Sequence, residues 1–331
     1  MNTAKVQPED YVQFLLGSPL RFTCTEAARV QPDPHDPPAH DSFTRLLTRL
    51  EPDAETLWEE ARPQIRLGDG ILVLDDSTLD KPYARQMGLV GWHWSGKHHA
   101  VVKGINLLTL LWTDGDRHIP CDYRIYDKAH DGFGKNDLFV QQLRAAKRRG
   151  LRPKCVCFDS WYSGLENLKE LRSLGWTWLG RLKSNRKVRV DFGRPQAIDT
   201  VDIPASGRVV HLPGYGPIRV FRVVATDGDT DHWATNELGM DALTRLKYGE
   251  FAWRIEEYHR GIKQFCGVEG CQARRAQAQR NHIGLSVRAF LRMECHCFAL
   301  GLSWFEAKLG VIRNAVRSYL ANPSMRLPQA A

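Results

Sequence analysis

Two short apolar runs, each followed at once by aspartate, place the strongest constraint on the fold of this chain. The runs are Ile71–Leu74, followed by Asp75 and Asp76, and Cys155–Phe158, followed by Asp159. A continuous apolar run of this length is typical of a strand buried within a sheet. Carboxylates that leave such strands are costly to desolvate unless they are paired or bind a cation. The runs therefore predict a sheet whose acidic strand ends suit Mg²⁺, which prefers oxygen ligands.

The segments around these runs predict a mixed α/β core. Further strands are expected at residues 100–112, 117–126, 176–181 and 232–237, and helices at 136–149 and 164–174. The resulting order of three strands, a helix, a strand, a helix and a strand produces a mixed sheet with helices on its faces. Alternating residues and turn signals over 188–225 predict a small β-rich insertion, and the chain is expected to be helical from residue 241 onward.

The first 67 residues predict short helices separated by proline-rich breaks. Proline blocks helix and strand pairing, so the segment 31–38 is a loop, and Ser42 is expected as the N-cap of the next helix. Such helices could form a helix-turn-helix that docks on DNA, or a simple packing domain. The net charge of −5 over residues 1–70 opposes DNA binding by this segment alone.

Charge is unevenly distributed along the chain. The formal total is +8, with +10 over residues 141–190 and +7 over residues 251–331. Basic surfaces attract phosphate backbones, but they also simply keep proteins in solution, so charge alone favours neither interpretation. No run approaches the ~18 apolar residues of a membrane-spanning helix, no leader peptide is evident, and eight cysteines are too dilute for a disulfide scaffold. We therefore expect a reduced, cytoplasmic protein.

A third acidic position, Glu256, lies in a segment with helical periodicity. At ~100° per residue, Phe251, Ile255, Tyr258, Ile262 and Phe265 form one apolar stripe. The opposite side carries Trp253, Glu256, Arg260 and Lys263. One helix face thus offers a carboxylate and, one and two turns further on, two cations. Such a face suits phosphodiester chemistry, although an ordinary solvated helix shows the same pattern.

Together these residues resemble the DDE transposases of bacterial insertion sequences, nearest to the insertion-sequence-four-like branch and its relatives. The resemblance covers about residues 10–320 and rests on five motifs: Asp75-Asp-Ser-Thr-Leu-Asp-Lys81, Cys157-Phe-Asp-Ser-Trp-Tyr-Ser-Gly164, Gly180-Arg-Leu-Lys-Ser-Asn-Arg186, Trp233-Ala-Thr-Asn236 and Trp253-Arg-Ile-Glu-Glu-Tyr-His-Arg-Gly-Ile-Lys263. In that branch the third acid lies in a Tyr-x2-Arg-x3-Glu-x6-Lys signature. This chain has the glutamate and lysine spacing, but Ala252 at the arginine position.

The resemblance implies a ribonuclease-H-like mixed sheet core with helices, a β-rich insertion and a helical N-terminal domain. The corresponding division is 1–68 for the N-terminal domain with possible DNA binding, 69–187 for the first part of the catalytic core, 188–228 for the insertion, 229–320 for completion of the core and the C-terminal helices, and 321–331 for a tail. The implied activity is metal-dependent cleavage of transposon ends and strand transfer into target DNA.

The same resemblance implies the site residues. Asp75, Asp159 and Glu256 would be catalytic and would hold two Mg²⁺ (or Mn²⁺) ions, with Asp76 a rival for Asp75 because either fits the Asp-x-Ser/Thr pattern. Neighbouring strand residues point to opposite faces, so only one of this pair is expected to reach the metals. The expected DNA-binding residues are Lys183, Arg186, Lys187, Arg260, Lys263, Trp161 and Tyr162, the two aromatic rings serving either base stacking or core packing.

The expected partner is double-stranded DNA, as transposon ends and target, bound by a homodimer with no membrane association. The expected location is the bacterial cytoplasm, at the nucleoid when bound to DNA. Two alternatives stay open: another ribonuclease-H-like metal nuclease, and a transposase-derived protein that binds DNA without cutting it. A zinc site could also be formed by Cys266, Cys271, Cys295, His296 and Cys297. Their spacing does not match that of structural zinc ligands, so buried free cysteines are the better interpretation.

Overall fold

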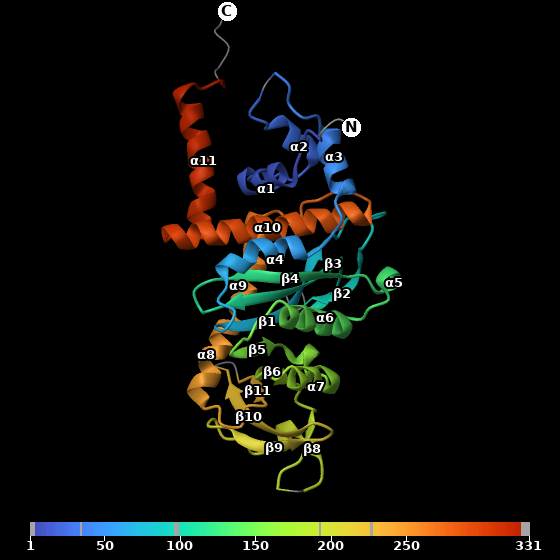
Figure 1. Cartoon of the computed structure of the whole chain (residues 1–331), viewed down its shortest axis with the longest axis vertical. Coiled ribbons are helices and arrows are strands. Elements are labelled where there is room, and N and C mark those ends of the chain that lie inside the picture. Colours follow the sequence, from blue (N-terminus) through green and yellow to red (C-terminus); the bar gives the residue numbers. More distant parts are fainter. Residues whose placement is uncertain (1–3, 34, 96–98, 192, 226–227, 326–331) are drawn as a thin grey trace, which may run out of the picture. The chain divides into compact units, whose positions relative to one another are not determined.

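The computed structural model describes residues 4–325 except 34, 96–98, 192, 226 and 227 (Figure 1). The chain forms two compact units. One, the sheet unit, comprises Asp53–Ala84 and Leu89–His259, and the other, the helical unit, comprises Met1–Pro52, Arg85–Gly88 and Arg260–Ala331.

Five strands form the centre of the nine-stranded sheet that the described residues of the sheet unit build. Strand β1 (Ile71–Asp80) pairs antiparallel with β3 (Ala100–Thr113), which pairs antiparallel with β4 (Ile119–Tyr126). On its other side β1 pairs parallel with β5 (Cys155–Phe158), and β5 pairs parallel with β6 (Trp178–Leu182). Figure 1 shows this order, β4-β3-β1-β5-β6. Three antiparallel strands followed by two parallel ones confirm the predicted ribonuclease-H-like mixed sheet.

Helices supply the crossovers that parallel pairing requires. Helix α6 (Lys135–Arg148) leads from β4 to β5 and contacts β3 and β4, and α7 (Leu165–Ser173) leads from β5 to β6. Helix α8 (Ala242–Ala252) contacts β1 and β5. The apolar residues of β1 and β5 are buried throughout, as continuous hydrophobic runs predict.

The segment expected as a β-rich insertion partly extends the core sheet. Strand β11 (Thr230–Thr235) pairs antiparallel with β6, then β10 (Gly216–Val224) pairs with β11 and β9 (Arg208–Leu212) with β10. The short strands β7 (Lys187–Val188) and β8 (Gln196–Ala197) form a separate two-stranded sheet. Strands β10 and β9 of the expected insertion therefore extend the core sheet beyond β11 rather than folding only on themselves.

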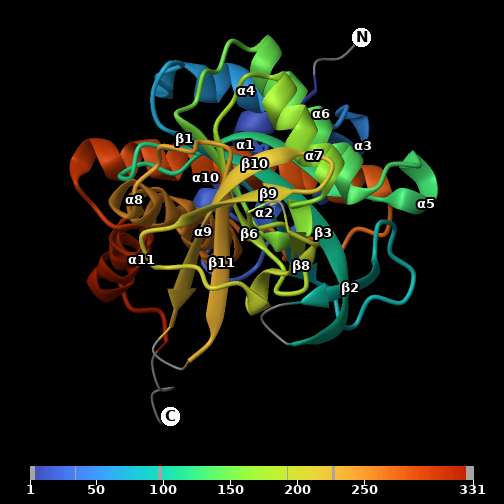
Figure 2. The same cartoon turned by 90° about the horizontal axis from the view of Figure 1, so that it is seen from below.

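A hairpin that the sequence did not predict precedes β3. Strand β2 (Gly91–Ser95) pairs antiparallel with the first residues of β3, and Figure 2 shows the two strands side by side. Its alternate residues Trp92 and Trp94 are exposed, whereas His93 on the other face packs edge-on against Tyr126. Burial alternates along this strand, but its large apolar residues are on the exposed face, so the sequence lacks the usual pattern of buried apolar and exposed polar residues.

The first 68 residues, expected as one domain, are divided between the units. Helices α1 (Pro8–Gly17), α2 (Cys24–Arg29) and α3 (His40–Arg49) belong to the helical unit. Helix α4 (Glu55–Ala61) and the 3-10 turn Arg62–Gln64 belong to the sheet unit, where α4 contacts β4 and Tyr123 donates a hydrogen bond to the carbonyl of Asp53 at 2.9 Å. Ser42 is not the N-cap of α3, because the helix begins two residues earlier, after Ala39.

The helical unit is assembled around α10 (Ala276–Leu300), which contacts α1, α3 and α11 (Trp304–Ala321). Buried polar contacts link these helices: Tyr11 Oη lies 3.0 Å from His282 Nδ1, and Lys308 donates to the carbonyls of Leu15, Leu16 and Phe265. Among the described residues, no helix is long and apolar enough to cross a membrane.

Candidate active site

Asp75 and Asp76 occupy adjacent positions in β1 and face opposite sides of the sheet. Asp75 pairs with Thr109 of β3, whose hydroxyl lies 3.4 Å from that of Tyr258 in α9 (Arg254–Phe265). Asp76 lies on the α6 side, where Lys135 contacts its carboxylate at 2.8 Å. The alternation of side chains along a strand therefore gives the two carboxylates different surroundings.

Asp75 lies beside two potential ligands from α9. One ligand atom each from Asp75, Glu256 and His259 lie within 4.8 Å of one another. Glu256 and His259 are three residues apart on the helix, with 3.9 Å between Glu256 Oε2 and His259 Nδ1. The helical repeat places both side chains on the same face, so strand β1 and helix α9 together build the cluster.

Asp159 follows β5 directly and caps the 3-10 turn Ser160–Tyr162. Its carboxylate accepts a hydrogen bond from the backbone N–H of Trp161 at 2.9 Å. Because β1 and β5 are parallel neighbours, their carboxyl ends meet at one edge of the sheet. Asp159 is consequently near enough to Asp75 for its charge to act on that carboxyl, although it is not one of the three residues in the ligand group.

The carboxylates perturb one another. Burial, and then the charges of Asp159, Asp76 and Glu256, raise the pKa of Asp75 well above its usual value. Desolvation and the charge of Asp76 also raise the pKa of Asp159, against the opposing hydrogen bonds of the following backbone N–H groups. An accumulation of negative charge with raised pKa values is characteristic of a functional site.

Asp76 is fully engaged within the protein. Its carboxylate accepts hydrogen bonds from Asn106 Nδ2 at 2.6 Å, Lys135 Nζ at 2.8 Å and Tyr162 Oη at 2.5 Å. Burial raises the pKa of this carboxyl, but Lys135, Tyr162 and Asn106 outweigh that effect and lower it below the usual value. These contacts indicate a structural ion pair, and they leave Asp75 as the residue of the pair that faces Glu256.

Helix α9 is anchored to the sheet unit on both sides of Glu256. Glu257 accepts hydrogen bonds from Arg254 at 2.7 Å and lies 2.8 Å from Nε2 of His118, which precedes β4. Ile255 and Tyr258 are buried, as the apolar stripe predicts. These contacts hold the first turns of α9 so that Glu256, which remains half exposed, faces Asp75.

The residues present fit a divalent cation. The two carboxylates supply the oxygen ligands that Mg²⁺ and Mn²⁺ prefer, and the imidazole adds a nitrogen donor. Nε2 of His259 is buried and has no hydrogen-bond partner within the described part of the chain. The mutual repulsion of the acids, visible in the raised pKa of Asp75, is what a bound cation would relieve.

The expected DNA-binding residues have different environments. Tyr162 is completely buried and stacks on Phe139, so its predicted stacking on a base is wrong and its role is packing. Trp161 is 55% exposed. Lys183 and Lys187 are exposed and Arg186 half buried in the sheet unit, while Arg260 and Lys263 belong to the helical unit, where Lys263 lies 3.6 Å from Glu269.

Two residues of the site escaped the sequence analysis. His259 had a usable signal, since Glu-x-x-His spacing places two ligands on one helix face. Lys135 had none, because only the folded chain brings the start of α6 to Asp76.

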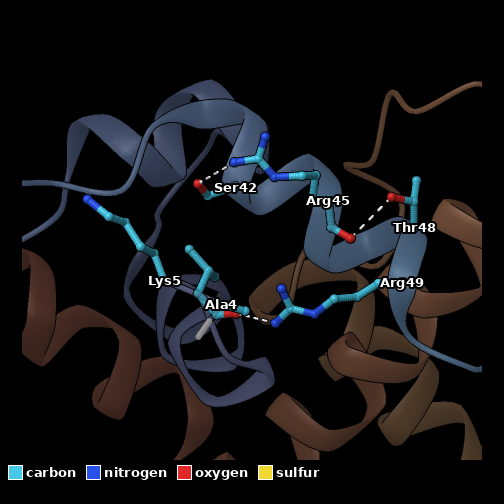
Figure 3. Close-up of a pocket in the computed structure, with 7 residues that line it drawn as sticks. Ala4, Lys5, Ser42, Arg45, Thr48 and Arg49 are labelled. Atoms are coloured by element: carbon cyan, nitrogen blue, oxygen red, sulfur yellow. Dashed lines mark hydrogen bonds between the residues drawn. The ribbon is translucent and has the colours of Figure 1, made fainter. Parts of the chain in front are cut away.

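A pocket of about 610 Å³ lies among residues of the helical unit and contains none of these acids (Figure 3). Its basic side chains are already engaged: Lys5 pairs with Asp36, Arg45 with Asp41, and Arg49 donates to the carbonyl of Val6. Two of the three basic side chains are therefore neutralised by carboxylates, and the third is held by a backbone carbonyl.

The acid cluster on a ribonuclease-H-like sheet defines a candidate metal-dependent nuclease site. Consistent with this, the family model described as "DDE superfamily endonuclease" matches residues 9–240. The chain belongs to the DDE superfamily endonuclease family. The matched segment includes Asp75 and Asp159 and ends before Glu256.

Two further comparisons were made. The cryo-EM structure of a piggyBac transposase synaptic complex with hairpin DNA is similar to this chain, with a TM-score of 0.49 and 13% sequence identity over 98% of this chain and 76% of that one. No curated protein matches the sequence.

Proposed function

We propose that this protein is a transposase that cleaves transposon ends and joins them to target DNA, with Asp75, Asp159 and Glu256 as its catalytic acids. The observation that carries the proposal is the meeting of Asp75 with Glu256 and His259 within 4.8 Å, from segments far apart in the sequence. Membership of the DDE endonuclease family supports a nuclease. The five sequence motifs favour the insertion-sequence-four-like branch, and hence transposition.

Each residue has a separate role in this proposal. Asp75 and Glu256 would hold divalent cations from two sides, with His259 as a nitrogen ligand and Asp159 as the further carboxylate at the edge of the sheet. When bound, the two Mg²⁺ (or Mn²⁺) ions supply an activated water or 3′-hydroxyl and stabilise the leaving oxygen. Asp76 holds Lys135 and Tyr162 in place rather than binding metal. Beyond these roles, the protein would position the reacting groups and supply charge that stabilises the transition state.

The proposed substrate is double-stranded DNA, which a homodimer would hold as paired ends at the nucleoid. Exposed Lys183 and Lys187, and Arg186, would follow the phosphate backbone from the sheet unit. Arg260 and Lys263 would add contacts from the later turns of α9.

The test is Mg²⁺- or Mn²⁺-dependent nicking of a labelled duplex that carries the inverted repeats flanking the gene. Asp75→Asn, Asp159→Asn and Glu256→Gln should each reduce the cleavage rate by at least about a hundredfold, because each removes a group that stabilises the transition state. Glu166→Gln is the matched control, since Glu166 is an exposed acid paired with Lys169. Binding of the duplex without any cleavage would favour a transposase-derived DNA-binding protein. Cleavage that survives Asp159→Asn would refute the assignment of the acids.

A further inference from the structure

The indole of Trp161 is presented to solvent beside the catalytic acids. The Asp159 carboxylate accepts the Trp161 backbone N–H at 2.9 Å, which fixes the turn immediately after β5. Within this turn Tyr162 points inward and is fully buried, whereas 55% of Trp161 is exposed. A large aromatic ring left exposed at a fixed position calls for an explanation other than core packing.

Two lysines from different elements lie against this ring. Lys135 Nζ, at the start of α6, is 5.7 Å from the centroid of the Trp161 ring. Lys183 Nζ, in the connection between β6 and β7, is 5.6 Å from it. Lys135 is also fixed by Asp76 at 2.8 Å and lies 5.8 Å from the centroid of Tyr126.

The ring restrains both ammonium groups, of which Lys135 is also paired with the carboxylate of Asp76. A cation–π contact restrains the position of a lysine, yet leaves its full positive charge available to an anion. Lys183 is exposed and has no carboxylate partner within the described part of the chain. Because Asp76 offsets the charge of Lys135, Lys183 is the member of this pair whose charge is open to an anion, while Lys135 can still donate an N–H to it.

We propose that Lys135, Trp161 and Lys183 form a phosphate clamp for the backbone of the DNA strand that enters the acid cluster. The inference rests on the proposed function and adds to it a defined subsite, including Lys135, next to Asp159. Trp161 acts as the spacer that keeps both ammonium groups in position. Since the clamp adjoins Asp159 and Asp76, the phosphate it holds neighbours the phosphodiester to be cut.

Clamp formation can be measured by binding alone. The assay is fluorescence anisotropy of a labelled 20-base-pair duplex in EDTA, over 50 to 200 mM NaCl. Lys183→Gln should reduce the slope of log affinity against log salt by about 0.9, the contribution of one phosphate contact. Trp161→Leu should weaken binding about two- to fivefold with an unchanged slope, because the charges remain but lose their restraint. The double variant Lys183→Gln/Trp161→Leu should lose less affinity for DNA than the product of the two single losses.

Matched controls separate the clamp from general effects. Lys169→Gln removes a surface lysine that is paired with Glu166, and Trp92→Leu removes another exposed indole of the sheet unit. Both should bind DNA like the wild type. Lys135 is tested as the double variant Asp76→Asn/Lys135→Gln against the wild type. This variant removes the whole ion pair, so no buried charge loses its partner, and the slope should again fall by about 0.9.

An unchanged slope in Lys183→Gln, strictly multiplicative effects of the Lys183 and Trp161 variants, or equal losses in the controls would overturn the clamp. A second test adds 10 mM inorganic phosphate to the DNA-binding assay. If phosphate weakens DNA binding more than NaCl of equal ionic strength does, the site binds free phosphate, and the proposed DNA clamp is overturned. Because the assay contains no divalent cation, its result is independent of cleavage. Failure of the nicking test with an intact clamp would reject only the proposed reaction.

Discussion

Replacement of Asp75 by asparagine should stabilise the metal-free protein while removing its response to divalent cations. The side chain keeps its shape but loses the charge that faces Glu256, Asp76 and Asp159. The pKa of Asp75 is raised above its ordinary value of 3.8, so the folded chain holds this proton more tightly than the unfolded chain does. The contribution of Asp75 to stability therefore falls as the pH rises above that ordinary value, and the gain in Asp75→Asn grows over the same range.

The size of the gain follows from the geometry. The ligand oxygens of Asp75 and Glu256 are no more than 4.8 Å apart. Two unit charges at that separation repel by about 3.5 kcal/mol at an effective dielectric constant of about 20. Because 49% of the Glu256 side chain is exposed, solvent screens this repulsion. We therefore expect a net stabilisation of about 1–2 kcal/mol, or about 3–6 °C in Tm for a unit of this size.

Thermal unfolding at pH 7.5 in EDTA, and again with 10 mM MgCl₂ or MnCl₂, provides the assay. The wild type should gain about 1.4 kcal/mol when the cation is at ten times its Kd, whereas Asp75→Asn should gain much less. Glu166→Gln serves as the control for removal of an acid outside the cluster. A metal-free Asp75→Asn protein less stable than the wild type, or an equal metal response in both, would refute this account of the cluster.

Three further outcomes are expected. Asp76→Ala should destabilise the fold by about 3–5 kcal/mol in urea unfolding, because Lys135 loses its buried partner; a loss below 1 kcal/mol would contradict the ion pair. Glu257→Gln should weaken the contact of α9 with His118 and slow metal-dependent nicking several-fold, with duplex binding in EDTA as the control that should not change. Burial lowers the pKa of Lys308 to about 8. The unfolded chain therefore binds this proton more tightly between about pH 8 and 10.5, so the contribution of Lys308 to stability rises with pH there. Lys308→Met should abolish that rise in urea unfolding, and an identical pH profile would exclude it.

Much of the core followed from local sequence patterns. The apolar runs before Asp75 and Asp159 became adjacent parallel strands, and the stripe through Ile255 and Tyr258 became the buried face of α9. Periodicity reports such features well because burial of a strand or helix face selects residues at regular spacing.

Pairing between segments that are distant in the sequence was harder to predict from the sequence. Strand β2 was missed because Trp92 and Trp94 face solvent. Residues 208–224 were recognised as strands, but their alternation does not show that they pair with the edge of the main sheet. The choice between Asp75 and Asp76 also needed the fold, since it depends on Lys135 from α6 and Glu256 from α9.

The pairing of β1 on both sides determines which aspartate faces Glu256. Ten residue pairs with β3, from Ile71↔Thr113 to Asp80↔Gly104, and four with β5 set its alignment. Sliding β1 by one position would turn each carboxylate to the opposite face of the sheet, and in one direction it would bring Asp76 to the place of Asp75. Deleting a single residue within Ile71–Leu74 would thus put Asp76 where Asp75 now lies without altering either acid, which makes the length of this strand as decisive for the site as the identity of its aspartates.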